Sequence, residues 1–318
     1  MNFPASSPSR YRRLALYAWI VAGFNVLVAL WGAYVRASGS GAGCGAHWPL
    51  CNGEFVPATQ RAATWIEFAH RASSGLDLLA GVLLTGLCFR FFPPRHRVRR
   101  AGFWALIFLC NEAVLGAALV LLREVGRNQS WTRVGFLSLH LVNTFLLLAA
   151  LALTARWCGQ APAAAASEAV PAAGSKLRWS TALVLLATML IGITGAIAAL
   201  GDTLFPQKTL AGALHQDVSQ AAPLLLRARV LHPLVAISLA LVLLGWIHSC
   251  MERRLTPVAR RIAWILAGLV LAQLAVGVLN IALLAPIPVQ MLHLLGAYLL
   301  WMTLVLFANE ILTAPSRT

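Results

Sequence analysis

Long apolar runs alternate with short polar segments along almost the whole chain. A membrane-spanning helix needs about 20 mostly apolar residues in a row, and the sequence contains eight runs of suitable length. The predicted spans are residues 14–35, 65–92, 101–122, 134–156, 180–200, 230–250, 262–284 and 289–312. This pattern predicts an all-α integral membrane protein with eight transmembrane helices.

A stretch rich in alanine and proline, residues 159–174, separates the first four spans from the last four. Its composition is typical of a flexible linker. The two sets of spans have a similar glycine-to-histidine spacing, since Gly32 precedes His70 by 38 residues and Gly195 precedes His232 by 37. We therefore predict a tandem pair of four-helix bundles in parallel orientation, since four helices return the chain to its starting side. The predicted units are an N-terminal half, a cytoplasmic linker and a C-terminal half, residues 1–158, 159–179 and 180–318.

Composition and charge support a membrane location and give an orientation. Hydrophobic residues make up 59% of the chain and charged residues only 11%, against about 25% charged residues in a typical soluble domain. The net charge is +15, and many of the basic residues form clusters at the N-terminus and in the second, fourth and sixth connections. The positive-inside rule then places both termini in the cytoplasm, with the protein in the cell inner (plasma) membrane. Because these clusters follow the connections rather than one helical face, the sequence predicts no nucleic-acid partner.

Four of the eight histidines lie on predicted spans, one on each of the second, fourth, sixth and eighth: His70, His140, His232 and His293. Each comes within the first one or two turns of an inward-running helix, within about 10 Å of the outer boundary. A single intramembrane histidine is explained equally well by an interhelical hydrogen bond. Four at matched depth, two in each half, instead favour two haem irons with two axial imidazoles each. Zinc would need three or four clustered ligands.

Charged residues accompany these histidines. Glu67 lies one helical turn before the first of them, on the same face, and the second half has no such acid. This asymmetry predicts a reacting site in the first half and an electron-supplying site in the second. Arg71 and Arg229 either pair with haem propionates or snorkel toward the interface. Glu112 either pairs with Arg71 or stays protonated, and the sequence leaves its role and that of Asp77 open.

A glycine-rich outer loop, residues 36–64, contains Cys44 and Cys51 with six residues between them. A disulfide is plausible in an oxidising outer compartment, where it would pin the loop as a lid. A redox relay would need an accessible, reducible pair. A metal site that combines both thiols with His47 is the weakest of these interpretations.

Three motifs together resemble the haem A synthase family, in its bacterial type with a cysteine pair in the first outer loop. They are Gly39–Gly41, Trp48–Gly53 and Glu67–Arg71, and the three later histidines fall where that family has its own. The resemblance extends over about residues 14–312 and implies the disulfide between Cys44 and Cys51. Loops of the family often have an acid before the tryptophan, where this chain has His47.

The resemblance implies an enzyme that oxidises the C8 methyl group of haem O to a formyl group, giving haem A for cytochrome oxidase. It implies Glu67 as the catalytic residue and His70 and His140 as axial ligands of the substrate haem iron. It also implies a haem b cofactor whose iron is held by His232 and His293. The implied partners are the haem O substrate, membrane lipid, haem O synthase, oxidase assembly factors and an electron-transfer partner.

Two other functions explain the four histidines. A dihaem b-type membrane electron carrier would use the same ligands, but it gives no reason for Glu67 or for the long outer loop. A haem transporter or chaperone would bind haem without releasing an oxidised product. Extraction and chromatography of the bound pigment would separate these functions from a synthase.

Overall fold

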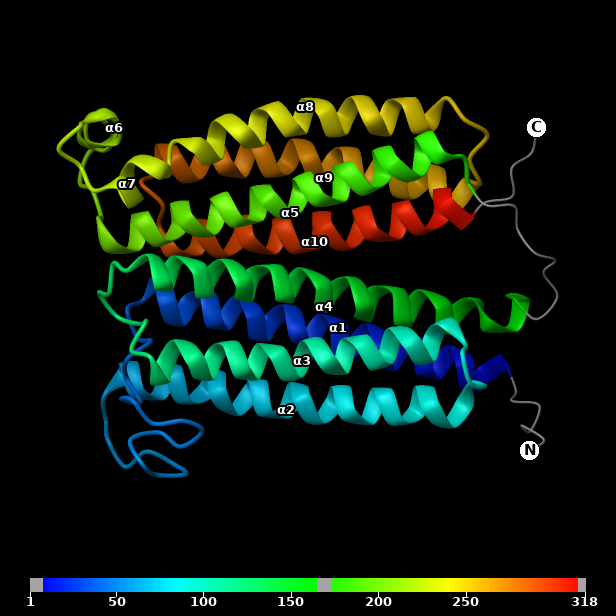
Figure 1. The fold of residues 1–318 in the computed structure, drawn as a ribbon, viewed down its shortest axis with the longest axis horizontal. Helices are drawn as coiled ribbons and strands as arrows, with labels where there is room; N and C mark the ends of the chain where they lie inside the picture. Colours follow the sequence, from blue (N-terminus) through cyan, green and yellow to red (C-terminus); the bar gives the residue numbers. More distant parts are fainter. Residues whose placement is uncertain (1–7, 165–172, 314–318) are drawn as a thin grey trace.

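A computed structural model describes residues 8–164 and 173–313. Within these ranges it contains ten α-helices: α1 (Pro8–Ala37), α2 (Ala62–Phe91), α3 (Arg97–Leu121), α4 (Trp131–Ala164), α5 (Ser175–Leu204), α6 (Leu210–Val218), α7 (Leu224–Ala228), α8 (Leu231–Met251), α9 (Pro257–Ala282) and α10 (Ile287–Thr313). In the described part, eight spans are long and apolar enough to cross a membrane, with α7 and α8 together forming one of them. The predicted fold class is therefore confirmed, and the chain is a multi-pass membrane protein (Figure 1).

Most of the helices begin before the predicted spans, because the prediction counted only the apolar residues and helical structure continues into polar ends. α1, for example, has 30 residues and begins at Pro8, before the arginines near the N-terminus. The predicted outer loop 201–229 contains the end of α5 and the short helices α6 and α7, of which α7 belongs to the same candidate span as α8. Helix also occupies both ends of the predicted linker, residues 159–179, of which 165–172 lie outside the described residues.

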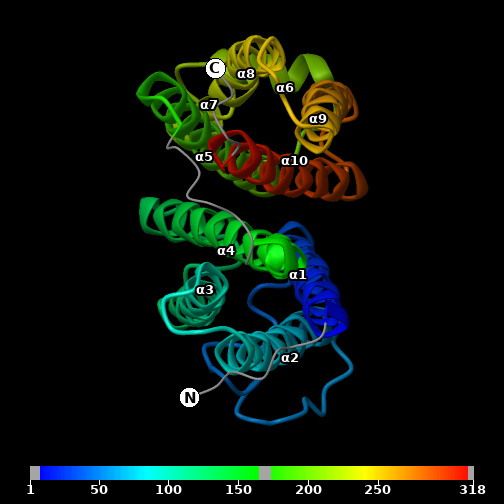
Figure 2. The same ribbon diagram turned by 90° about the vertical axis from the view of Figure 1, so that its right-hand side faces the viewer.

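Figures 1 and 2 show two groups of long helices lying side by side. α1 to α4 form the first bundle, and α5, α8, α9 and α10 form the second. The bundles meet where α1 and α4 contact α5 and α10. At this junction the Trp301 indole N–H donates to the carbonyl of Phe145 at 2.6 Å, and their rings stack with centroids 5.1 Å apart.

The two ends of the bundles differ in how they are filled. The termini end, where α1 begins and α10 ends, holds most of the buried apolar core of each bundle. The loop end carries residues 38–61 together with α6 and α7 (Figure 1). Because the well-packed cores lie toward the termini end, the helices are held together there while a space remains between them at the loop end.

Candidate functional site

A continuous cavity of about 1280 Å³ lies toward the loop end, and residues of both bundles line it. The four histidines singled out in the sequence all belong to its wall: His70, His140, His232 and His293. They come from α2, α4, α8 and α10. The fold therefore brings the four candidate ligands around one space, with two of them contributed by each bundle.

Glycines on neighbouring helices make room for the imidazole rings. A Cβ atom at Gly32 would lie 2.8 Å from Cε1 of His70, and one at Gly195 would lie 3.0 Å from Cε1 of His232. Real Cβ atoms essentially never come closer than 3.0 Å to such an atom, and contacts of 3.0 Å are already tight. The similar glycine-to-histidine spacing in the two halves therefore reflects a direct contact between the glycine and the ring.

His140 has a carboxylate partner. Its Nδ1 lies 2.6 Å from Oε2 of Glu112, and the Asn143 side-chain amide donates to the other carboxylate oxygen at 2.7 Å. An ionised carboxylate only accepts hydrogen bonds, so the hydrogen of the neutral imidazole is on Nδ1 and Nε2 keeps its lone pair. The sequence left Arg71 open as a partner of Glu112, but in the structure Arg71 forms an ion pair with Glu67.

His232 has a neutral partner, the Thr194 hydroxyl, whose oxygen lies 3.0 Å from the imidazole Nδ1. That hydroxyl donates its one hydrogen to the carbonyl of Ile191 at 2.9 Å. It can therefore only accept from His232, which puts the ring hydrogen on Nδ1. As at His140, this leaves the Nε2 lone pair available to a ligand.

The remaining two histidines, His70 and His293, have buried Nδ1 atoms without a hydrogen-bond partner among the described residues. In the same part of the chain, no hydrogen bond or ion pair engages Nε2 of any of the four cavity histidines. Nε2 of each ring is therefore free of protein partners among the described residues and available to a ligand in the cavity.

The arrangement fits haem iron better than a protein-bound zinc ion. Among the described residues, no three or more histidine, cysteine, aspartate or glutamate side chains gather as a metal site. The ring centroids of His232 and His293 are 6.2 Å apart, and metal–nitrogen bonds of about 2 Å leave room for one metal atom between them. His232 and His293 would together hold the iron of a haem, and this assignment fits both observations.

Glu67 is buried in the cavity wall with only 3% of its surface exposed. One carboxylate oxygen accepts from the backbone N–H of Cys44 at 2.9 Å, and the other accepts from Arg71 at 2.5 Å. Arg71 also donates to the carbonyls of His47 and Leu50, each at 2.7 Å. Glu67 and Arg71 therefore fasten the first loop onto α2, immediately beside His70.

The first loop is closed by a disulfide between Cys44 and Cys51. Both residues are almost fully buried. The disulfide and the bonds from Glu67 hold one side of the loop against the cavity wall, whereas Trp48 and Phe55 of the same loop line the cavity and remain largely exposed.

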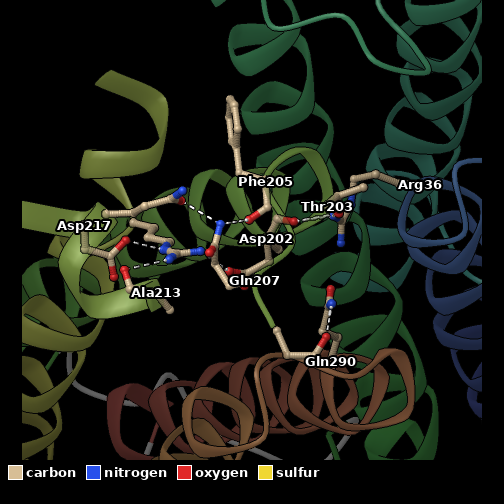
Figure 3. Close-up of polar contacts among 12 residues, drawn as sticks. Arg36, Asp202, Thr203, Phe205, Gln207, Ala213, Asp217 and Gln290 are labelled. Carbon is tan, nitrogen blue, oxygen red and sulfur yellow. Dashed lines mark hydrogen bonds and ion pairs between the residues drawn. The ribbon is translucent and has the colours of Figure 1, made fainter. Parts of the chain in front are cut away.

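The loop end of the second bundle is held by ion pairs instead (Figure 3). The Arg229 guanidinium donates to Asp217 at 2.5 Å and to Asp202 at 3.0 Å. Arg36 reaches across from α1 and donates to the Ala199 carbonyl and the Thr203 hydroxyl of α5, each at 2.7 Å. Arg229 thus has carboxylate partners within the protein, and Arg36 joins the two bundles.

Sequence reasoning missed two polar features of the cavity wall. Arg36 directly follows a predicted span and belongs to the predicted outer loop, so no feature of the neighbouring sequence indicates its contact with the other bundle. Asn25 is a polar residue inside an apolar run, and its side chain donates to Asp77 at 2.6 Å. Asn25 and Asp77 are both buried, and one side-chain oxygen of each has no hydrogen-bond partner among the described residues. The position of Asn25 as an isolated polar residue within a predicted span could have drawn attention to it, but the sequence does not identify Asp77 as its partner.

Comparison with known proteins places this chain in a family. The COX15-CtaA family model, described as cytochrome oxidase assembly protein, matches residues 15–305. Two Thermus thermophilus relatives named protoheme IX farnesyltransferase are 46% identical over 308 residues, which is 96% of this chain and 50% of each relative. A Lysinibacillus sphaericus relative named heme A synthase is 32% identical over 179 residues, 56% of this chain and 55% of that protein.

The chain thus spans about half the length of these relatives. The family model, in contrast, covers all eight candidate spans at least in part. The disulfide in the first loop and the eight spans agree with the resemblance drawn from the sequence. The chain belongs to the COX15-CtaA family of cytochrome oxidase assembly proteins.

Proposed function

We propose that this protein is a haem A synthase, which oxidises the C8 methyl group of haem O to a formyl group. The observation that carries the proposal is the cavity shared by two histidine pairs, one from each bundle. Haem O would be the substrate at His70 and His140. Haem b would be the cofactor at His232 and His293, where, when bound, it supplies one-electron redox chemistry.

The first half is the proposed reacting side because it combines a buried acid with a covering loop. Glu67 lines the cavity and lies on the same helix as His70. Its contacts with Cys44 and Arg71 hold the carboxylate in place, beside His70, where it could accept or relay a proton from the substrate. The second half holds its histidines without an equivalent acid, which suits a supporting haem.

The proposed orientation puts the loop end outside and the termini end in the cytoplasm of a cell inner membrane. The arginine clusters that follow α2 and α8 belong to the termini end, as the positive-inside rule requires. The disulfide then lies in an oxidising compartment. Membrane lipid, haem O synthase, oxidase assembly factors and an electron-transfer partner are the proposed partners.

The name of the Thermus relatives describes a farnesyl transfer, but this chain matches only half of the length of each of them. The name therefore does not assign a farnesyl transfer to the matched half.

Pigment extraction tests the proposal against an electron carrier or a haem transporter. The full chain would be expressed in a host that makes haem O but lacks its own haem A synthase. Recovery of haem A, or of a hydroxylated haem O, from the membranes supports a synthase. Haem b or unmodified haem O alone, in protein that retains bound haem, would rule the synthase activity out.

Glu67→Gln tests the proposed proton role within that assay. The amide keeps the size of the side chain and an oxygen that can accept from Cys44, but it cannot hold or pass a proton as a carboxylate does. We expect haem O to accumulate at the expense of haem A while bound haem b stays constant. Full conversion by the variant would contradict a catalytic role for Glu67.

A further inference from the structure

The two bundles place different side chains behind the second histidine of each pair. In the first bundle, Glu112 of α3 contacts the imidazole of His140 directly, with Oε2 lying 2.6 Å from Nδ1. In the second bundle, Gln273 of α9 occupies the corresponding place, four residues before a glycine in both cases. Its amide donates to the backbone carbonyl of His293 at 2.8 Å and does not reach the ring.

The imidazoles therefore differ in what supports them. His293 has a buried Nδ1 with no partner among the described residues. His232, the other histidine of that pair, donates to the neutral Thr194 hydroxyl. Among the four cavity histidines, His140 alone has a described ion-pair contact with a carboxylate.

A carboxylate behind a metal-binding imidazole has two physical effects. It fixes which ring nitrogen carries the hydrogen and sets the orientation of the ring, and it makes the opposite nitrogen a stronger electron donor. A charge-assisted hydrogen bond is also shorter and about twice as strong as a neutral one. An amide that points at the backbone gives neither effect to the ring.

Glu112 is itself held in place for this role. Its other oxygen accepts from the Asn143 side-chain amide at 2.7 Å, and the second hydrogen of that amide goes to the Phe108 carbonyl at 2.8 Å. Asn143 thus ties the carboxylate to α3 and α4 together. The acid is directed at His140 by its surroundings instead of being free to turn into the cavity.

We propose that Glu112 is a positioning residue that holds His140 with Nε2 toward the cavity and strengthens its donation to a haem iron in the first half. The inference rests on the proposed function, because it requires both pairs to bind haem. Ferric iron carries one more positive charge than ferrous iron, so a stronger donor stabilises the ferric form more. The first-half haem then has a lower midpoint potential than it would have without Glu112.

The test uses purified full-length protein loaded with haem b as the probe for both halves. Redox titration with optical detection is compared for the wild type, Glu112→Gln and the matched control Thr194→Val. Glu112→Gln is expected to raise one midpoint potential and leave the other unchanged. A tenfold shift in the ratio of ferric to ferrous haem corresponds to about 59 mV for a one-electron couple. Thr194→Val should move the other potential instead, by less, because it removes a neutral bond.

Haem stoichiometry distinguishes failure of this inference from failure of the proposed function. If one of the two pairs in the wild type binds neither haem b nor haem O, the proposed function fails. If the wild type binds two haems and Glu112→Gln leaves both potentials unchanged, the positioning role of Glu112 is wrong and the proposed function stands.

Complete loss of the first-half haem in Glu112→Gln would be resolved by a second variant, Glu112→Asp, which restores an acid. Recovery of haem binding in Glu112→Asp, with the second-half spectrum unaltered throughout, supports the inference. Equal loss in both variants would overturn it, because the loss would then follow from the changed packing and not from the missing carboxylate.

Discussion

The two bundles carry histidines on equivalent helices, but they surround them with different chemistry. In the first bundle, His140 is backed by the Glu112 carboxylate, and Glu67 stands on the helix that carries His70. In the second, His232 is backed by the Thr194 hydroxyl. The first loop is closed by a disulfide, whereas the corresponding end of the second bundle is closed by ion pairs of Arg229.

This difference indicates that the two bundles share the arrangement of glycine and histidine but differ in the charged groups around it. The glycine beside the first histidine is present in both bundles, and it contacts the ring in both. The acids are concentrated around the first pair. A site that only holds a cofactor needs the space that the glycine leaves for the histidine ring. A site that performs proton-coupled chemistry needs nearby acids as well.

Removal of one histidine from each pair should produce the largest effects and would break the comparison most directly. We expect His293→Ala to abolish haem b retention by the second half, because the iron would lose one of its two histidine ligands and His232 alone would remain. His140→Ala should leave that haem in place and abolish conversion of haem O. Haem content and extracted pigment are the measurements. Loss of all haem in both variants would mean that the two pairs do not act separately.

The features that could be predicted from the sequence are those that depend on residues close together within one helix or one segment. The eight spans, the four histidines and Glu67 followed from apolar runs and from spacing within the sequence. The partners of these groups did not, because Glu112 meets His140 across two helices, and Arg36 meets α5 across the junction of the bundles. Such contacts depend on how helices rotate and pack, which composition and periodicity leave open.

Loss of the disulfide should have the next largest effect. Closing a short loop in this way contributes about 2–3 kcal/mol by the chain-entropy account. We expect Cys44→Ser with Cys51→Ser to loosen residues 44–54 by that amount, measured as faster amide hydrogen exchange. Asp217→Asn should loosen the second loop end less, since Arg229 keeps Asp202 as a partner. Equal loosening in both would show that the disulfide adds nothing beyond an ion pair.

Filling the space beside a histidine should have a smaller, graded effect. Gly32→Ala would place Cβ 2.8 Å from Cε1 of His70, whereas a Cβ at Gly86 of α2 would meet nothing within 4 Å. The first must push the ring off its rotamer at a cost of about 1 kcal/mol, which corresponds to several-fold weaker haem binding. Gly86→Ala adds the same methyl group to a helix outside the cavity wall and serves as the control. Similar haem affinities in the two variants would contradict the proposed close fit at His70.

The smallest effect concerns the termini end, where the two bundles cap equivalent helices differently. α3 begins after His96, whose Nδ1 accepts from the Val98 N–H at 3.2 Å. α9 begins after Thr256, whose hydroxyl accepts from the Ala259 N–H at 3.1 Å. Burial and the nearby Arg97 lower the pKa of His96 below its ordinary value. Of these two caps, only the first therefore has a titratable side chain.

A lowered pKa means that the unfolded chain takes up the proton first as the pH falls. The capping contribution is therefore complete above about pH 6.5 and is lost as the pH falls through the lower pKa of the folded state. Because His96 is partly solvated, the loss should stay below about 1 kcal/mol. We expect hydrogen exchange in the first turn of α3 to accelerate on acidification after correction for the intrinsic rate, while that of α9 does not. His96→Asn, a cap that does not titrate, should remove the difference, and its persistence in that variant would assign the pH dependence to another group.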